Sequence, residues 1–460
     1  MPIPEQVQKL LESEHISYGI TGHEQIMRPA NTLPPNVAVS VVLEDNEGKL
    51  QLIFPHDHLI DLNTLNERLG RNLTAIAPEN LQHILQSQGV DALPGIPQLT
   101  GFPTIVDDRL FDHNELYLES GQLGHFIKIR MADFKQILQN ATPMQVTEKI
   151  PNRPLTTDTN TDVKELTLAV ENFTSLRIKQ RLEQTIEIPP LPETAQRIIQ
   201  LRVDPNAAVK DLVDIVERDP SLAAQVVSWA SSPYYAAPGR VRSIEDAIVR
   251  VLGFDLVINL AIGLSLGKAL QPPKDHPHGF TPYWHQAAFT ATSVESLVRQ
   301  IPLKKRPELG LSYLCGLLHN FGYLVLAYVF PPYFSLICRH IEANPHINHV
   351  DIERHIIGVS RDQIGGWLMQ IWDMPEEVCT AIRYQNEAEY SGTHQEYPHL
   401  LNITGRLLRQ HGIGDAPDEG IIPQLYEYLE LNPANAANAV ASIVECESEI
   451  EQLSQFFKSA

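Results

Sequence analysis

Strand-like and helix-like runs of apolar residues alternate through the first 140 residues of the chain. The runs VAVSVVLED (37–45) and LQLIFP (50–55) are rich in β-branched residues and flank a turn, so they predict paired strands. The segment 61–70 predicts a helix, because Asp61 is a good N-cap and Gly70 suits the C-terminal end. A helix is also expected over 79–88 and 132–138, and strands over 102–108, 115–120 and 125–129. This mixture predicts an α/β domain.

From Val163 onward the apolar spacing changes to three and four residues, which is typical of helices. The preceding stretch, 141–162, is rich in Thr, Asn, Asp and Pro and predicts an interdomain linker. We therefore expect a multidomain protein of mixed α/β plus all-α class. Its predicted parts are an α/β domain (1–140), the linker, a helical domain with a leading helix (163–415), and C-terminal helices packing on that domain (416–460).

The longest uncharged stretch, 309–338, contains the motif GLLHNFG (316–322). Its length would suit a membrane span, but His319 and Asn320 are polar and Pro331–Pro332 would break a continuous helix. We expect a buried helix that ends before Pro331 and a second helix after it.

Composition limits the classes of function. The chain has 460 residues, 43% of them apolar, a net charge of -21 and a pI near 5.3, which disfavours broad binding to nucleic acid or anionic membrane. The N-terminus shows no secretory signal pattern, and the four cysteines form no CxxC pair, as in reduced cytosolic proteins. We predict a cytoplasmic protein.

Several histidines are candidates for metal-binding residues. His319 is followed by Asn320, which keeps the shape of an aspartate but lacks the charge that would help to hold a divalent ion. His340, His346, His349 and His355 are close in sequence, but their spacing does not match a closed zinc set. The triplet His56-Asp57-His58 follows a predicted strand and is interpreted as loop chemistry. No metal or other cofactor is expected.

Six motifs of the helical half occur in a recognisable order. They are IPPLPETA (188–195), LVDIVERDPSLAAQVVSWASSPYY (212–235), SIEDAIVRVLG (243–253), YWHQAAFTA (283–291), GLLHNFG (316–322) and IGGWLMQIWDMPEEVCTAIRYQN (364–386). In this order they resemble the HDOD family, the HD-related output domain of bacterial signalling proteins.

The HD superfamily, as this resemblance implies, builds a metal-dependent phosphohydrolase site from scattered His and Asp residues. His285 and His319 match its two histidines, Asn320 replaces the adjacent aspartate, and Gly405 replaces the final aspartate. Arg361 and the pair Tyr384-Gln385 stand where relatives carry histidines. Mg²⁺ and Mn²⁺ prefer oxygen ligands, so a site with two imidazoles and no carboxylate is predicted to be inactive.

The first 140 residues resemble the YbaK/ProX-like aminoacyl-tRNA deacylases, through SVVLEDNEGKLQLIFPHDHLIDLNTLNERLGRNLTAIAPENL, GFPTIVDDRLFDHNELYLESG and HFIKI. The resemblance implies a lysine on an early strand and a loop with Gly and Pro that places the ester. Here Val39 stands at the lysine position, and the loop contains Asp91, in place of glycine, and Pro94. Residues 1–150 carry 10 Lys plus Arg and 19 Asp plus Glu, a balance of -9, which disfavours tRNA binding.

We predict a bacterial regulatory protein in signal transduction, a pseudoenzyme whose helical domain binds protein partners and whose α/β domain is degenerate. Two enzymatic alternatives remain open at this point. One is aminoacyl-tRNA editing with Arg28 or another residue in place of the lysine, which leaves tRNA as a partner; the other is metal-dependent phosphohydrolysis at His285 and His319. No membrane partner is expected, and the sequence does not give the oligomeric state.

Overall fold

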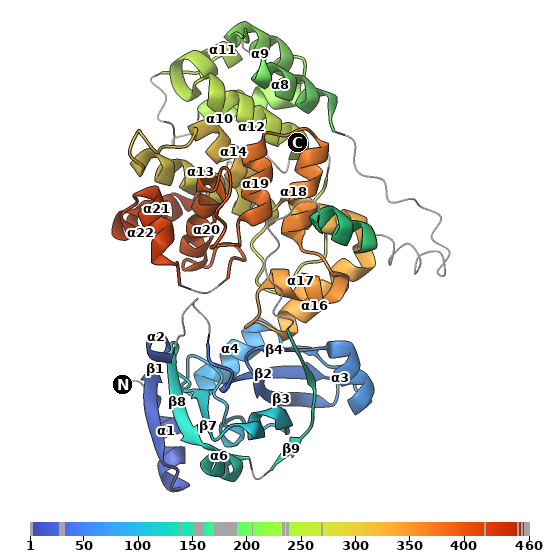
Figure 1. The fold of residues 1–460 in the computed structure, drawn as a ribbon, viewed down its shortest axis with the longest axis vertical. Helices are drawn as coiled ribbons and strands as arrows, with labels where there is room; N and C mark the ends of the chain where they lie inside the picture. The colour runs from blue at the N-terminus through green and yellow to red at the C-terminus, as the bar shows by residue number, and fades with distance from the viewer. Residues whose placement is uncertain are drawn as a thin grey trace, which may run out of the picture. The chain divides into compact units, whose positions relative to one another are not determined.

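A computed structural model of the chain forms two compact units (Figure 1). It describes residues 3–26, 33–138, 140–150, 161–169, 191–204, 206–231, 235, 239–267, 270–417, 420–448, 450–451 and 454. The α/β unit comprises Met1–Arg153, Asp275–Gly279 and Ser335–Ile352. The helical unit comprises Pro154–Lys274, Phe280–Phe334 and Glu353–Ala460. A short stretch from the helical half of the sequence therefore belongs to the α/β unit.

Strands and short helices alternate along the α/β unit. Its elements from the first 150 residues are α1 (Glu5–Ser13), β1 (Tyr18–Gly22), α2 (His23–Ile26), β2 (Val37–Asp45), β3 (Gly48–Pro55), β4 (His58–Ile60), α3 (Leu62–Leu69), β5 (Thr74–Ala75), α4 (Pro78–Ser87), α5 (Pro97–Thr100), β6 (Thr104–Val106), η1 (Asp108–Asp112), β7 (Glu115–Glu119), β8 (His125–Arg130), α6 (Met131–Ile137), β9 (Ala141–Pro143) and β10 (Thr147–Lys149).

The main sheet of this unit has the strand order β1-β8-β7-β2-β3-β6-β9, and β5 pairs with β2. The hairpin β2–β3 is antiparallel, with Val42 opposite Gln51, whereas β2 runs parallel to β7. Alternate side chains of β2 enter two different apolar cores, because successive residues of a strand point to opposite faces. Ala38 belongs to the same core as Leu118 and Phe134, whereas Val39 belongs to a second core with Phe54 and Ala343.

Residues 335–352 are held in the α/β unit by a side-chain amide. The Ile60 N–H donates to Asn344 Oδ1 at 2.6 Å, and Asn344 Nδ2 donates to the Ile60 carbonyl at 3.0 Å. Asn344 is fully buried, and β4 pairs with β10. The His346 ring lies edge-on to Phe54, with centroids 5.2 Å apart. The segment therefore completes a face of the sheet.

Helices build the other unit. They are α8 (Glu193–Val203), α9 (Val209–Val216), α10 (Pro220–Ala230), α11 (Ile244–Asp246), the π-helical turn η3 (Ala247–Leu252), α12 (Phe254–Gly267), α13 (Tyr283–Gln300), α14 (Leu309–Leu318), α15 (Phe321–Val329), α16 (Pro331–Ala343), α17 (His349–Ile357), α18 (Arg361–Ile371), α19 (Glu376–Tyr384), α20 (Glu396–Arg409), α21 (Pro423–Leu429) and α22 (Pro433–Glu445). The end of α16 and the start of α17 lie in the α/β unit. The predicted class of mixed α/β plus all-α is confirmed.

The uncharged stretch forms α14, α15 and the start of α16, and α14 and α15 pack inside the helical unit. By length and composition Leu309–Val329 could cross a membrane, but 89% of its most apolar window is buried among other helices. The end of α15 at Val329, before Pro331, agrees with the sequence expectation.

The structure differs from the expected linker. Ala141–Pro143 pairs with β6 and Thr147–Lys149 pairs with β4, so the first nine residues of 141–162 belong to the α/β unit. Residues 161–169 are helical, and 151–160 lie outside the described residues. Two short strands form within 141–149 despite the polar sequence, because neighbouring strands supply hydrogen-bond partners for their backbones.

Candidate functional site

Two close helix crossings position the GLLHNFG motif. A Cβ at Gly316 would lie 2.6 Å from the Ala291 Cα, so this glycine lets α14 approach α13. A Cβ at Gly322 would collide with the carbonyl oxygen of Arg361, so the second glycine lets α15 approach the start of α18. The motif therefore places Asn320, the N-cap residue of α15, beside Arg361.

Arg361 is the centre of the site, although it is only 5% exposed. Its backbone N–H donates to Glu353 Oε2 at 2.7 Å, and its Nε donates to Glu353 Oε1. Its Nη1 donates to Asp415 Oδ2 and, at 3.3 Å, to Asn320 Oδ1. The guanidinium also lies 5.1 Å from the centroid of the Tyr323 ring. Burial alone would lower the pKa of Arg361, but Glu353 and Asp415 outweigh burial and raise it.

Gln286 completes the ring of contacts around Arg361. Its Nε2 donates to Asp415 Oδ1 at 2.9 Å, and its Oε1 accepts from Asn320 Nδ2 at 3.3 Å. Gln286 and Asn320 are both 4% exposed. His285 and Gln286 are adjacent on α13, but Gln286 is the one that bonds to Asn320. The His285 ring packs against Phe289, with ring centroids 4.7 Å apart.

The Nδ1 of His319 lies 2.8 Å from the Gly316 carbonyl, and the ring is close enough to Asp415 and Arg361 to interact with their charges. Burial lowers the pKa of His319, so its imidazole is neutral at pH 7. Its carbonyl accepts a 2.6 Å hydrogen bond from Gln385 Nε2, which also donates to Asp362 Oδ1. Burial raises the pKa of Asp362 to about 7. The sequence-predicted Gln385 therefore supports the His319 backbone.

Gly405, which the sequence comparison places at the final aspartate, lies on α20 close to a loop whose carboxylate contacts Arg361. A Cβ at Gly405 would lie 3.2 Å from the Ala416 Cβ, and the adjacent Asp415 reaches Arg361 and Gln286. Asp415 comes from the loop after α20 and was not predicted. Glu353 and Gln286 were also missed, since nothing in one sequence pairs them with an arginine on another helix.

The donor set around Asn320 suits an arginine better than a metal ion. A guanidinium only donates hydrogen bonds and keeps its charge, so it satisfies the oxygens of Asn320, Glu353 and Asp415. A divalent cation beside it would meet a like charge. Within the described residues, no three His, Cys, Asp or Glu side chains form a group that could hold a metal ion.

A second buried arginine fixes the helical segment 161–169. Arg383 Nη2 donates to Asp162 Oδ1 at 2.8 Å, and its Nη1 donates to Glu387 Oε1 at 2.7 Å. Gln363 Nε2 donates to Asp162 Oδ1 and to Glu165 Oε2. Between these groups lies a space of about 10 Å³, roughly that of one water. This contact was not predicted from the sequence.

The deacylase-like positions are not brought together. Val39 is buried in one core, whereas its neighbour Ser40 faces the loop on the other side of the sheet. Gln51 Nε2 donates to Ser40 Oγ at 2.8 Å and to the Pro94 carbonyl at 3.2 Å. Asp91 is exposed and accepts a 2.8 Å hydrogen bond from Gln122. Arg28, the alternative cation, lies outside the described residues.

His346, in contrast, meets the His56-Asp57-His58 triplet in the α/β unit. His346 Nε2 lies 3.0 Å from the His58 carbonyl, and His58 Nδ1 lies 2.9 Å from Asp57 Oδ1. Burial, helped by the nearby His56, lowers the pKa of His346 to about 4, although the hydrogen bond with the His58 carbonyl acts in the opposite direction. These contacts hold residues 335–352 in place.

Comparisons with known proteins match each part of the chain to a protein family. The HDOD domain model matches residues 188–388, and the aminoacyl-tRNA editing domain model matches residues 19–137. A crystal structure from Marinobacter aquaeolei VT8, of a protein provisionally described as a signal transduction protein, is 43% identical, covers 99% of both chains and has a TM-score of 0.87.

More distant relatives match in part. An HDOD domain protein of unknown function from Geobacter sulfurreducens is 21% identical, covers 64% of this chain and 99% of that one, and has a TM-score of 0.51, which shows the fold alone. An uncharacterised protein of Treponema pallidum (strain Nichols) is 25% identical over 272 residues. That match spans 58% of this chain and 50% of the Treponema protein.

Proposed function

Because the chain belongs to the HDOD family and carries an aminoacyl-tRNA editing domain at its N-terminus, we propose that it is a bacterial, cytoplasmic signalling protein. Its helical domain acts as a non-catalytic output module that binds protein partners. The family relationship and the description of the Marinobacter relative support a signalling role. The finer proposal, absence of hydrolysis, rests on Arg361.

Arg361 carries the proposal because its guanidinium takes up the oxygens that a hydrolytic metal would need. Phosphoester hydrolysis at such a centre requires a cation that binds substrate oxygens and lowers the pKa of bound water. Here Asn320 Oδ1 and Asp415 Oδ2 both accept from Arg361 Nη1. Glu353 is fully buried against the same side chain. The guanidinium of Arg361 thus occupies the place of a catalytic metal ion and has a structural role there.

The α/β domain is proposed to serve as a docking or sensing module without deacylase activity. Gln51 fills the space between β2 and the loop that contains Pro94, with Ser40, the Pro94 carbonyl and Thr100 as its partners. Gln51 is fully buried. A side chain that closes this space supports a structural role for the loop.

The deciding experiment compares metal content and hydrolysis in full-length protein purified without chelator. With bis(p-nitrophenyl) phosphate and added Mn²⁺, we expect no turnover above the buffer rate and less than a tenth of a metal ion per chain. Metal-dependent turnover that disappears in both His285→Ala and His319→Ala would overturn the proposal. The double variant Arg361→His/Asn320→Asp is the matched positive control, since it restores two metal-ligating side chains at this place and is expected to bind metal.

A further inference from the structure

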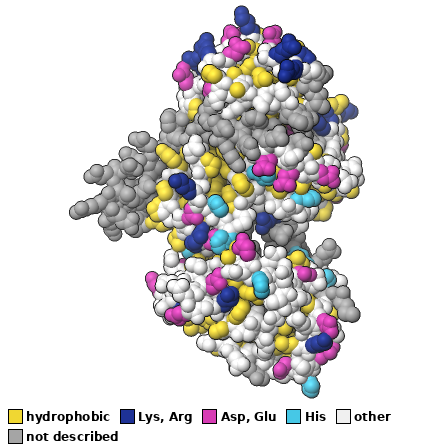
Figure 2. Space-filling model, turned by 180° about the vertical axis from the view of Figure 1, so that it is seen from behind, with side chains coloured by type: hydrophobic (Ala, Val, Ile, Leu, Met, Phe, Trp, Pro, Cys, Tyr) yellow, Lys and Arg dark blue, Asp and Glu magenta, His cyan; other side chains and the backbone are white. Residues whose placement is uncertain are grey.

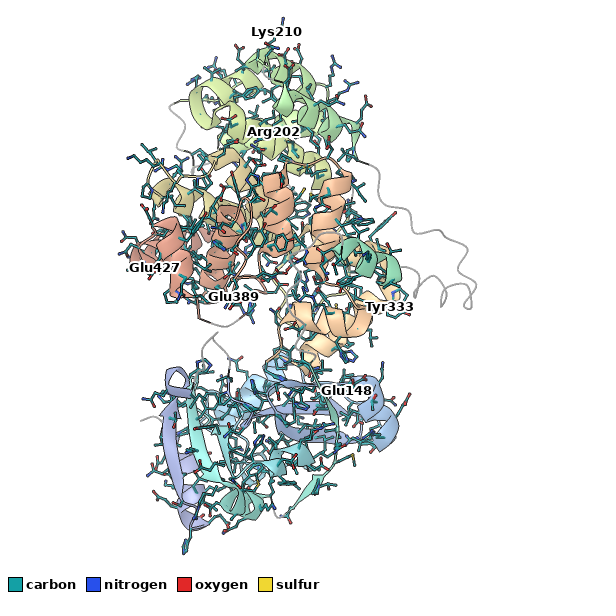
Figure 3. All side chains as sticks on the ribbon, in the orientation of Figure 1. Glu148, Arg202, Lys210, Tyr333, Glu389 and Glu427 are labelled. Atoms are coloured by element: carbon teal, nitrogen blue, oxygen red, sulfur yellow. The ribbon has the colours of Figure 1, made fainter. Side chains whose placement is uncertain are left out.

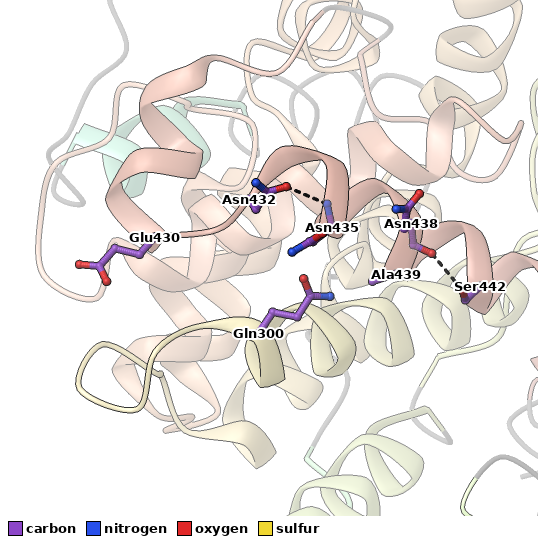
Figure 4. A pocket seen from close by; sticks show the side chains of 7 residues that line it. All are labelled: Gln300, Glu430, Asn432, Asn435, Asn438, Ala439 and Ser442. Atoms are coloured by element: carbon purple, nitrogen blue, oxygen red, sulfur yellow. Dashed lines mark hydrogen bonds between the residues drawn. The ribbon is translucent and has the colours of Figure 1, made fainter.

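A groove lies between the C-terminal end of α13 and the helix α22 of the helical unit (Figure 4). Its volume is about 600 Å³, within the roughly 300–1,000 Å³ range of ligand sites. We call it the amide groove, and its lining residues are Gln300, Glu430, Asn432, Asn435, Asn438, Ala439 and Ser442. We infer that the amide groove binds an extended, acidic peptide segment of a protein partner.

The lining chemistry matches a peptide backbone. Gln300 points from the end of α13 toward Asn435 on α22 (Figure 4). The side chains of Gln300, Asn435 and Asn438 are exposed and make no hydrogen bond within the described part of the chain. A carboxamide both donates and accepts, so it can pair with the N–H and C=O of one peptide unit. The groove therefore offers several such pairs and has only one apolar lining residue, Ala439.

The spacing of these residues sets the length of the ligand. Asn435, Asn438 and Ser442 recur at three and four residues, so they lie along one face of α22. Asn432 caps the helix by accepting from the Asn435 N–H at 3.0 Å. From Asn432 to Ser442 the helix rises about 15 Å, at ~1.5 Å per residue. An extended chain covers that distance with about four or five residues, at ~3.3 Å each.

Charge at one end of the groove selects an acidic ligand. The loop that joins α13 to α14 carries Lys304, Lys305 and Arg306, in a chain whose net charge is -21. Lys305 Nζ lies 2.9 Å from Glu430 Oε1, and Glu430 lines the groove, so the basic loop borders it. Lys304 makes no ion pair with any described residue. The chain as a whole repels acidic ligands, but Lys305 offsets the charge of Glu430 and Lys304 adds a further positive charge, so carboxylates are attracted locally at this border.

The loop is held in a fixed shape and presents an apolar contact beside the charges. Arg306 donates to the carbonyls of Ile301 at 3.0 Å and Arg299 at 2.8 Å. Leu303 is 81% exposed. A partner segment that places acidic residues near Lys304 and an apolar residue near Leu303 would use both features. This inference rests on the proposed role of the helical domain in binding proteins and names the surface and the chemistry of the partner.

The test uses full-length protein and three labelled decapeptides, (Glu-Thr)₅, (Gln-Thr)₅ and (Lys-Thr)₅, with fluorescence anisotropy at 50 and 300 mM salt. We expect (Glu-Thr)₅ to bind at least tenfold more tightly than (Lys-Thr)₅ and to weaken at the higher salt. Lys304→Glu/Lys305→Glu should weaken its binding at least tenfold. Asn435→Asp/Asn438→Asp, which keeps side-chain size and adds negative charge, should do the same.

Lys210→Glu is the matched control, because Lys210 on α9 lies away from α21, where Glu427 is labelled (Figure 3). This variant should bind (Glu-Thr)₅ within twofold of the parent. The inference is overturned if the acidic peptide binds no better than the basic one, or if both groove variants stay within twofold of the parent. Either result would leave the proposed function intact if the protein remains metal-free and inactive. Failure of the peptide-binding inference can therefore be told apart from failure of the proposed function.

Discussion

At the scale of single residues, one arginine explains why the helical centre is folded but is proposed to be inactive. A buried ion pair contributes little net stability, yet removal of one partner leaves the other charge buried without compensation. Arg361 is bonded to two carboxylates, those of Glu353 and Asp415. Its loss would therefore leave two carboxylates without a cation.

Arg361→Ala should lower the free energy of unfolding of the helical unit by about 3–5 kcal/mol, the range for breaking a buried ion pair. All four tryptophans of the chain belong to this unit, so tryptophan fluorescence during urea unfolding reports it selectively. Arg197→Ala is the control: Arg197 forms an exposed pair with Glu193, and its loss should cost less than about 1 kcal/mol. Equal effects of both variants would contradict the assignment of Arg361 as the centre.

A second residue-scale prediction concerns pH. The pKa of His346 falls to about 4 in the folded protein, against an ordinary value near 6.5. The folded state favours the neutral imidazole of His346. The stability of the α/β unit is therefore unaffected by this group above pH 6.5, and it decreases as the pH falls from 6.5 toward 4. Between pH 7.5 and 5.0 the α/β unit should lose about 2 kcal/mol from this group alone.

Hydrogen exchange of the peptides covering 50–60 and 335–352 measures this loss. His346→Gln, which can still donate to the His58 carbonyl, should flatten the pH dependence of protection. His56 lies near the same ring and titrates in both proteins, so the comparison isolates His346. An unchanged pH profile in the variant would refute the assignment.

The residues of the candidate site divide into those that the sequence could predict and those that it could not. Asn320 and His319 were found because the motif is local and its chemistry is visible in seven letters. Asp415 and Glu353 reach Arg361 from other segments, and only the fold brings the three together. Gly405 was expected to stand in place of the final aspartate, and the carboxylate of Asp415, in the following loop, contacts Arg361.

At the scale of elements, two glycines decide how closely helices pack. A methyl group at Gly322 would collide with the Arg361 carbonyl, which belongs to the backbone and cannot rotate away. Gly322→Ala should therefore destabilise the helical unit by about 1–3 kcal/mol or more, as overpacking does. Gly420→Ala is the matched control, since nothing lies within 4 Å of its added Cβ. Tryptophan-monitored unfolding of both variants checks the difference.

The segment 335–352 shows where element-level prediction fails. Its helical pattern was readable, but no pattern indicates that Asn344 bonds to both backbone groups of Ile60. The edge strands β9 and β10 were missed for a related reason, because three-residue strands rich in Thr and Glu depend on their neighbours. Longer runs such as 37–45 and 115–120 were predictable since their apolar periodicity is local.

Asn344→Ala should remove this attachment. The buried N–H and C=O of Ile60 would lose their partner, at a cost of about 1–3 kcal/mol for each group left unsatisfied. We expect faster hydrogen exchange at 58–60 and 340–347, with little change in tryptophan fluorescence. Asn63→Ala, an exposed substitution on α3, should change neither. Identical exchange in the two variants would contradict the role of Asn344.

At the scale of the whole molecule, the balance of charge on the α/β unit is the basis for predicting weak binding to polyanions. Lys and Arg side chains are few and separated on the face of this unit seen in Figure 2. Several of its cations are already paired: Arg71 with Asp45, Arg109 with Asp107, and Lys128 with Glu115. Each phosphate contact in a tRNA complex needs a Lys or Arg side chain that can exchange its carboxylate partner for the phosphate.

Full-length protein should therefore show no deacylation of mischarged tRNA above the uncatalysed rate, and binding to tRNA weaker than about 10⁻⁴–10⁻⁶ M, the usual non-specific range at physiological salt. The variant Val39→Lys tests whether the missing lysine alone is responsible. Val39 faces a packed core with Phe54 and Ala343, on the opposite face from the Ser40–Gln51 contact with Pro94. We expect Val39→Lys to destabilise the unit without restoring turnover, whereas turnover in either protein would show that the α/β domain has kept an editing site.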